Sequence, residues 1–99
     1  MASSNDYLIY TLDLLREVDG ITFKKMMGEY ILYRYGVIIG GIYDNRFLLK
    51  KTPSLLEYSF QEQIPYPNAK PMLLVDFEDS KAIKELVELT YNDLIIEKK

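Results

Sequence analysis

The chain contains 99 residues, is 48% hydrophobic and carries a formal net charge of −3. This length and apolar content suit one domain, spanning residues 1–99, with a single core. The sequence contains no His and no Cys, which excludes imidazole bases, thiol nucleophiles and thiolate zinc sites. The negative total also argues against non-specific binding to DNA. We therefore expect a protein that is not an enzyme and holds no metal or cofactor.

The N-terminal segment, residues 1–10, contains no basic stretch followed by an apolar core, so it does not match a secretory signal. The longest apolar run, around residues 37–43, is too short to cross a bilayer as a helix. A chain without Cys also suits a reducing compartment. We expect a cytoplasmic protein that does not associate with membranes.

An amphipathic helix is predicted near each end of the chain. The first follows N-cap candidates at residues 3–6 and ends at Asp19-Gly20. The last begins after Asp79 or Ser80, where nearby acids complement the helix dipole and are not expected to be catalytic. On a helical projection each has one apolar face. The first face contains Tyr7, Leu8, Thr11, Leu12, Leu14, Leu15 and Val18, and the last contains Ala82, Ile83, Leu86, Val87, Leu89, Thr90, Tyr91 and Leu94.

Residues 21–28 predict an irregular first strand that ends at Gly28. Met26 and Met27 lie at its end and could belong to an adaptable contact surface. Filling the edge of the core is the commoner role of Met, and we expect it here.

The segment from Tyr30 to Lys51 predicts a three-stranded antiparallel meander. Its apolar runs are interrupted at Tyr35-Gly36 and Asp44-Asn45, which are two-residue turn signals typical of β-hairpins. We expect strands near residues 29–34, 37–43 and 46–51.

Uninterrupted pairing through both turns predicts two unlike faces of the meander. The apolar face, expected to receive the helices, contains Ile31, Tyr33, Ile38, Gly40, Ile42, Phe47 and Leu49. The opposite face mixes aromatic, apolar and basic residues, which is typical of interaction surfaces. Besides Val37, Ile39 and Gly41, it contains the residues that we predict to form an interaction surface: Tyr30, Leu32, Arg34, Tyr43, Arg46, Leu48 and Lys50. Gly40-Gly41 favours a bulge, which would change this register.

The segment from Lys24 to Lys51 contains six basic and two acidic residues, so the predicted sheet is basic and the flanking helices are acidic. We expect compensation of charge within the domain, with a ligand footprint as the alternative. Between the meander and the last helix, Thr52-Pro53 predicts the start of a short helix, residues 61–70 predict a Pro-rich loop, and residues 72–77 predict a strand.

The segment Lys25-Met26-Met27-Gly28-Glu29-Tyr30, followed by Tyr33, Gly36, residues 44–50 and Pro71-Met72, resembles the N-terminal domain of the TfoX (Sxy) competence regulators. The resemblance extends from about Tyr7 to Leu94, and its short motif is carried by Lys25, Met26, Gly28 and Tyr30. It implies a small α+β domain with helices packed on one face of an antiparallel meander sheet, similar in outline to type III secretion chaperones.

The resemblance also implies a bacterial source and a link to the regulation of DNA-uptake genes, where full-length members act with the cyclic-AMP receptor protein. The full-length regulators continue into a second, helical domain, so we expect a stand-alone copy of the first. The family supplies no catalytic residues.

Two functions are compatible with these observations. One is a regulatory protein-interaction module that dimerises or binds a protein partner, such as transcription machinery, through the predicted interaction surface. The other is a small-molecule or nucleic-acid binding domain that uses the same surface, although direct DNA binding is not expected. A concave pocket in which Arg34 and Arg46 converge would favour ligand binding, whereas a flat apolar patch would favour protein interaction.

Overall fold

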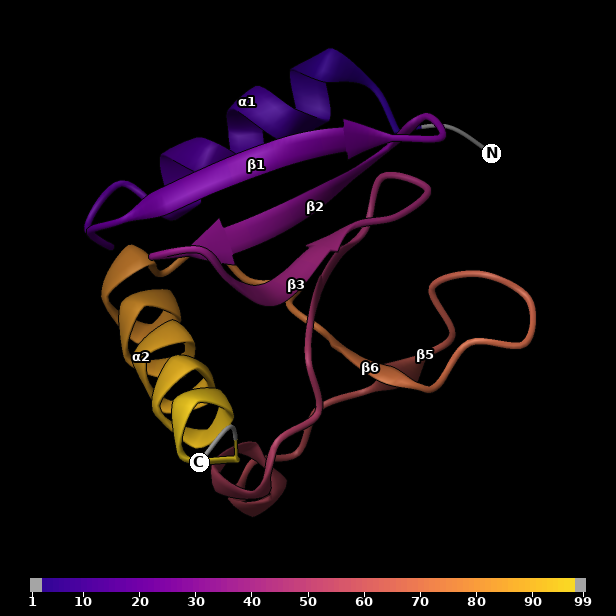
Figure 1. The fold of residues 1–99 in the computed structure, drawn as a ribbon. Helices are drawn as coiled ribbons and strands as arrows, with labels where there is room; N and C mark the ends of the chain where they lie inside the picture. Colours follow the sequence, from indigo (N-terminus) through magenta and orange to yellow (C-terminus); the bar gives the residue numbers. More distant parts are fainter. Residues whose placement is uncertain (1–2, 98–99) are drawn as a thin grey trace.

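The computed structural model describes residues 3–97, which form an α+β fold with a six-stranded antiparallel sheet and two α-helices (Figure 1). The strand order is β1-β2-β3-β4-β6-β5. The predicted fold class is confirmed. The elements are α1 (Asn5–Leu14), β1 (Ile21–Met26), β2 (Glu29–Arg34), β3 (Val37–Ile42), β4 (Phe47–Leu49), the 3₁₀ helix η1 (Pro53–Glu57), β5 (Glu62–Gln63), β6 (Met72–Leu74) and α2 (Ser80–Glu97).

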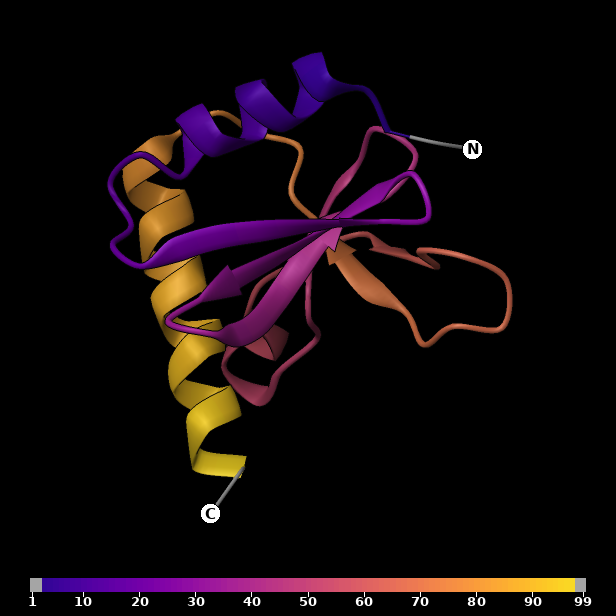
Figure 2. The ribbon, with the colours of Figure 1, turned by 45° about the horizontal axis from the view of Figure 1, so that its top comes forward.

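Both α-helices lie on the same side of the sheet (Figure 2). The hydroxyl of Ser4 accepts a hydrogen bond from the Tyr7 amide and caps α1, and the Asp79 carboxylate accepts from the first amides of α2. The predicted apolar faces are confirmed. Their buried members are Leu8, Thr11, Leu14, Leu15 and Val18 near the N-terminus and Ile83, Leu86, Val87 and Thr90 in α2. The predicted end of the first helix at Asp19-Gly20 is wrong, because α1 ends at Leu14 and turns lead on to β1.

The two predicted hairpin turns are confirmed by positive φ angles at both central residues. Tyr35 and Gly36 have φ of 48° and 78°, and Asp44 and Asn45 have φ of 52° and 54°. Such paired left-handed residues are typical of type I′ turns, whose twist matches that of the flanking strands. The pairing next to each turn is also as predicted, namely Arg34 with Val37 and Ile42 with Phe47.

A β-bulge between these turns overturns part of the predicted facing. Tyr33 pairs with Ile38, but Leu32 pairs with Gly40, so Ile39 is an extra residue in β3. The shift by one residue reverses the faces of β2 relative to the turn at Asp44-Asn45. A Cβ atom at Gly40 would lie 2.2 Å from the Leu48 carbonyl oxygen, so only glycine permits this close approach of the two backbones.

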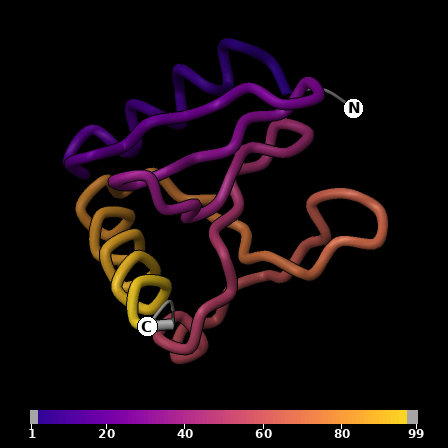
Figure 3. The backbone as a smooth tube through the Cα atoms, viewed as in Figure 1, coloured from indigo at the N-terminus to yellow at the C-terminus, as the bar shows by residue number. Residues whose placement is uncertain are grey.

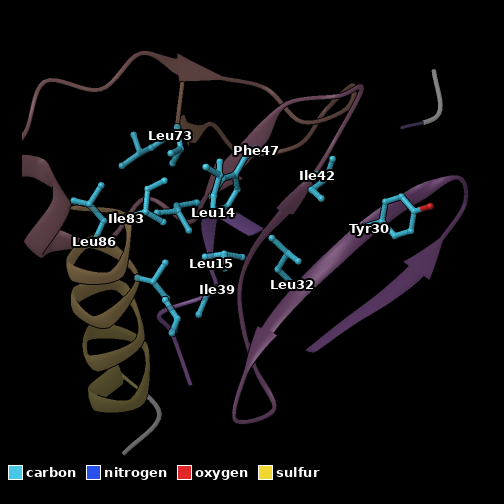
Figure 4. Packing of buried hydrophobic residues seen from close by; sticks show 14 of the residues in the cluster. Leu14, Leu15, Tyr30, Leu32, Ile39, Ile42, Phe47, Leu73, Ile83 and Leu86 are labelled. Carbon is cyan, nitrogen blue, oxygen red and sulfur yellow. The ribbon is translucent and has the colours of Figure 1, made fainter. Parts of the chain in front are cut away.

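The sheet contributes Tyr30, Leu32, Ile39, Ile42, Phe47 and Leu49 to the core under the helices (Figure 4). The predicted core positions Ile42, Phe47 and Leu49 are therefore confirmed. The predicted core positions Ile31, Tyr33 and Ile38 are wrong, because the bulge turns them to the opposite side. We call that side, on which Ile31, Tyr33 and Ile38 lie, the second face of the sheet.

Strand β1 forms an exposed edge of the sheet (Figure 1). Met26 is 44% exposed and Met27, in the β1–β2 turn, is 97% exposed. The prediction that this Met pair fills the core edge is therefore wrong.

Candidate functional site

The seven residues of the predicted interaction surface do not share one exposed face. Tyr30 and Leu32 are buried in the core under the helices, and Leu48 is fully buried outside that cluster. The remaining members, Arg34, Tyr43, Arg46 and Lys50, are partly exposed, but they lie in different places. The prediction of one open surface is wrong, because the bulge separates residues that an uninterrupted register would bring together.

Arg34 joins β2 to α2. Its Nε donates to the Asp19 carbonyl oxygen at 3.0 Å, and its guanidinium lies 5.0 Å from the ring centroid of Tyr91 and 5.2 Å from that of Tyr35. Its Nη2 lies 3.8 Å from a Glu88 carboxylate oxygen. With these partners, Arg34 holds two elements together and does not present its charge to a ligand.

Arg46 joins the β3–β4 turn to β5. Its Nε donates to the Tyr43 carbonyl oxygen at 3.0 Å, its Nη1 to Gln63 Oε1 at 2.7 Å and its Nη2 to the Ile64 carbonyl oxygen at 3.3 Å. Each of the three guanidinium nitrogens donates one of these bonds. Arg34 and Arg46 therefore do not converge on a pocket.

The short motif that suggested the resemblance to TfoX domains lies in the β1–β2 hairpin. Lys25 and Met26 are exposed on β1, and the Lys25 ammonium lies 6.0 Å from the centroid of the Tyr30 ring. Gly28 adopts φ of 83° in the turn, and its carbonyl oxygen accepts from the Ser3 amide at 3.0 Å. These residues shape the hairpin and its contact with the N-terminal segment.

A cleft of about 710 Å³ opens on the second face of the sheet. Its floor comes from β2 and β3, one wall from the segment after β4, and the opposite wall from the loop between β5 and β6, which extends away from the sheet and returns (Figure 3). We call it the second-face cleft, and the residues on which its chemistry depends are Ile31, Ile38, Tyr43, Lys50, Lys51, Tyr66, Lys70, Met72 and Leu94.

The charged residues of the second-face cleft are three lysines. None of the described residues that line it is acidic. The Lys51 ammonium lies 2.9 Å from a Glu62 carboxylate oxygen, whereas Lys50 and Lys70 form no ion pair with another described residue. The cleft is therefore a concave positive site on a chain whose total charge is negative.

Two tyrosines meet at the side of the cleft. The rings of Tyr43 and Tyr66 have centroids 6.0 Å apart and an interplanar angle of 53°. Tyr66 is 58% exposed, whereas burial raises the pKa of the Tyr43 hydroxyl above its ordinary value. Tyr43 therefore stays protonated and can act as a hydrogen-bond donor at neutral pH.

The wall after β4 is held to α2 by Asp93. Its carboxylate accepts from the Ser54 amide at 2.8 Å and from the Ser54 hydroxyl at 2.7 Å. The Ser54 amide, then its hydroxyl, hold the pKa of Asp93 below its ordinary value of 3.8. Thr52 itself is 3% exposed, and its Oγ1 has no hydrogen-bond partner among the described residues.

Within residues 3–97 no group of three or more His, Cys, Asp or Glu side chains is placed to hold a metal ion. The helices of the same range include none that combines the length and the apolar character needed to cross a membrane. The second-face cleft combines basic, aromatic and apolar side chains in one concave site, and it is the candidate functional site of the described residues.

The sequence prediction named two residues of the cleft, Tyr43 and Lys50, but missed Lys51, Tyr66 and Lys70. The Pro-rich composition of residues 61–70 correctly predicted a loop, although Glu62–Gln63 forms the short strand β5 within it. Nothing in that composition indicated that the loop would face β3 across a cleft. The signal that could have indicated the site is the presence of aromatic and basic residues, namely Lys51, Tyr66 and Lys70, in segments outside the helices and strands.

No family model matches the chain. The chain is 31% identical over 94 residues to a protein from Spirochaeta aurantia that is described as an uncharacterized 12.7 kDa protein in the trpE 5′ region. The matched region covers 91% of this chain and 82% of that protein.

Proposed function

The chain belongs to the family of the 12.7 kDa Spirochaeta aurantia protein, and we propose that it is a non-enzymatic, cytoplasmic regulatory domain that binds a ligand in the second-face cleft. The observation that carries the proposal is the cleft itself. Its volume of about 710 Å³ lies in the range of small-molecule sites, which combine an apolar lining with a few polar groups.

The regulatory part of the proposal is supported by the resemblance to the TfoX N-terminal domain. Three residues that carry the resemblance, Lys50, Pro71 and Met72, line the second-face cleft. Ligand binding there would alter the surface offered to a protein partner, such as transcription machinery that acts on DNA-uptake genes in a bacterium. Regulation by ligand requires only that the partner prefer one of the two states of the domain.

The test is a titration of the ¹⁵N-labelled chain with a charge-diverse library of small fragments, followed by NMR. We expect the binders to shift the amide signals of Ile38, Lys51 and Met72. Ile38→Glu should abolish these shifts by placing a carboxylate on the cleft floor. Ile9→Glu introduces the same change on α1, where Ile9 is 59% exposed, and should leave binding intact. Binders that shift only amides outside the cleft, or a library without binders, would refute ligand binding there.

A second candidate function is the docking of a protein partner along the β1 edge. Phe23, Met26 and Met27 are 46%, 44% and 97% exposed there, and Lys24 and Lys25 form no ion pair with a described residue. A second copy of the chain would bring the same two lysines to the contact. The partner that fits is therefore an extended segment with acidic and apolar residues, which would add a strand to the sheet.

This second function predicts that a peptide alternating Glu and Val shifts the β1 amides in NMR spectra, and that Lys24→Glu/Lys25→Glu abolishes the effect. A peptide alternating Lys and Val is the control and should not bind. Light scattering decides whether a second copy occupies the edge instead: a dimer that the Lys24→Glu/Lys25→Glu variant dissociates would replace the acidic partner with self-association.

A further inference from the structure

We infer that the ligand of the second-face cleft is a small organic anion, in which one carboxylate or phosphate group is joined to a flat apolar body. The inference rests on the proposed ligand-binding function and adds the chemical class of the ligand. Three features of the cleft carry it: its uncompensated lysines, its apolar floor and its bounded size.

The lysines define the charge of the ligand. Lys50 lies after β4 and Lys70 lies at the end of the loop between β5 and β6, so the two ammonium groups come from separate walls of the cleft. Lys51 is compensated by Glu62 at 2.9 Å, whereas the described structure offers no carboxylate to the other two. An anion entering between these walls gains attraction from both lysines and meets no acidic lining residue.

The floor defines the body of the ligand. Ile31 and Ile38 are apolar side chains that the bulge directs away from the core, and Ile38 is 37% exposed. Met72 of β6 and Leu94 of α2 extend the same apolar lining. A planar group can contact this floor and also reach the Tyr43–Tyr66 pair, and Met adapts its shape to ligands of different outline.

The size and surroundings favour a small molecule over a nucleic acid. A polyanion needs a positive surface that extends along its backbone, whereas the second-face cleft is bounded at about 710 Å³ and its lining contains three lysines. The chain as a whole carries a net charge of −3, which does not favour association with a long polyanion. A small anion can bind within the cleft and does not require a positive surface beyond it.

Four related probes test the charge and the body separately in NMR titrations of the full chain. The probes are 1-naphthoate, 1-naphthyl phosphate, the neutral 1-naphthamide and inorganic phosphate. We expect both naphthyl anions to shift the cleft amides at millimolar concentration, and each to bind about tenfold more tightly than 1-naphthamide or inorganic phosphate. The order of the two anions identifies the preferred head group.

The variant Lys50→Gln/Lys70→Gln removes the two uncompensated charges and should weaken binding of the preferred naphthyl anion about tenfold without changing binding of 1-naphthamide. Lys81→Gln/Lys84→Gln makes the same change in charge at two lysines of α2 outside the cleft lining, and should retain wild-type affinity. Circular dichroism checks that each variant is folded. The comparison of probes on the wild-type chain does not depend on the variants.

The outcomes separate this inference from the proposed function. If 1-naphthamide shifts the cleft amides as strongly as the anions do, the cleft binds ligands but the anionic class is wrong. If inorganic phosphate binds as tightly as 1-naphthyl phosphate, the apolar body is wrong. If no probe shifts a cleft amide, the inference is overturned, while the charge-diverse library decides independently whether the cleft binds ligands.

Discussion

The rings of Tyr43 and Tyr66 contact each other with centroids 6.0 Å apart, although one follows β3 and the other belongs to the loop between β5 and β6. This contact joins the end of β3, at the floor of the second-face cleft, to the loop that forms one wall. Arg46 makes a parallel connection through its hydrogen bonds to Gln63 and Ile64. The shape of the cleft therefore depends on a few side chains that hold an irregular loop against a hairpin.

The first prediction concerns Tyr66. We expect Tyr66→Ala to lower the free energy of unfolding by only about 0.5–1.5 kcal/mol, the value of an aromatic pair, because Tyr66 is 58% exposed. Hydrogen exchange of the amides in residues 64–71 should accelerate more than exchange in the helices. Tyr66→Phe keeps the ring and serves as the control. Unchanged exchange in Tyr66→Ala would show that the ring contact does not order the loop.

The second prediction compares two glycines. Gly40→Ala places Cβ 2.2 Å from the Leu48 carbonyl oxygen and 3.0 Å from Leu49 Cα, so β3 and β4 must separate, and we expect a loss of about 3 kcal/mol or more in urea denaturation. Gly36→Ala meets no atom within 4 Å and has only its φ of 78° to accommodate, at a cost of about 1 kcal/mol. Equal losses would refute the close approach at Gly40.

The third prediction concerns Arg34. Arg34→Lys keeps the positive charge beside Glu88 but loses the planar group that contacts the rings of Tyr35 and Tyr91. We expect thermal and urea unfolding to show a loss of about 1–2 kcal/mol for Arg34→Lys. Arg16→Lys is the control, because Arg16 is exposed and interacts only with Asp13 among the described residues. If Arg34→Lys leaves the free energy of unfolding unchanged, the positive charge at this position is sufficient and the planar group is not needed for stability.

The fourth prediction compares Thr52 with Ser54. Thr52→Val removes a buried hydroxyl whose Oγ1 has no described partner, so we expect stability to be unchanged or slightly increased. Ser54→Ala removes a donor to Asp93 at 2.7 Å and should cost about 1–2 kcal/mol, since the acceptor is charged. A similar loss in Thr52→Val, measured by urea denaturation, would show that its hydroxyl also donates to Asp93.

The fifth prediction concerns acid unfolding. The two hydrogen bonds from Ser54 lower the pKa of Asp93 below 3.8 in the folded chain, so the folded state holds this proton less tightly than the unfolded state. Asp93 therefore stabilises the fold above pH 3.8, and this contribution is lost as the pH falls through the folded pKa. Asp93→Asn should reduce stability near pH 7 and flatten its pH dependence below 3.8. An unchanged profile would contradict this role.

Much of the fold was predictable because it depends on local chemistry. The spacing of apolar residues predicted both helices, and Tyr35-Gly36 and Asp44-Asn45 predicted both hairpin turns with the correct adjacent pairs. Turn residues act over a few positions, since their backbone angles are set by their own side chains and by the twist of the flanking strands. The fold class follows from this order of elements.

The sequence by itself therefore determined the elements, the two turns and the positive charge of the meander. The tertiary structure decided which of those residues share a surface. Gly40-Gly41 favoured a bulge, but only the packing of Leu32 and Ile39 under the helices selected Ile39 as the extra residue. Side chains alternate along a strand, so one extra residue exchanges core and surface for everything beyond it. That exchange buried Tyr30 and Leu32 and placed Ile31 and Ile38 in the second-face cleft.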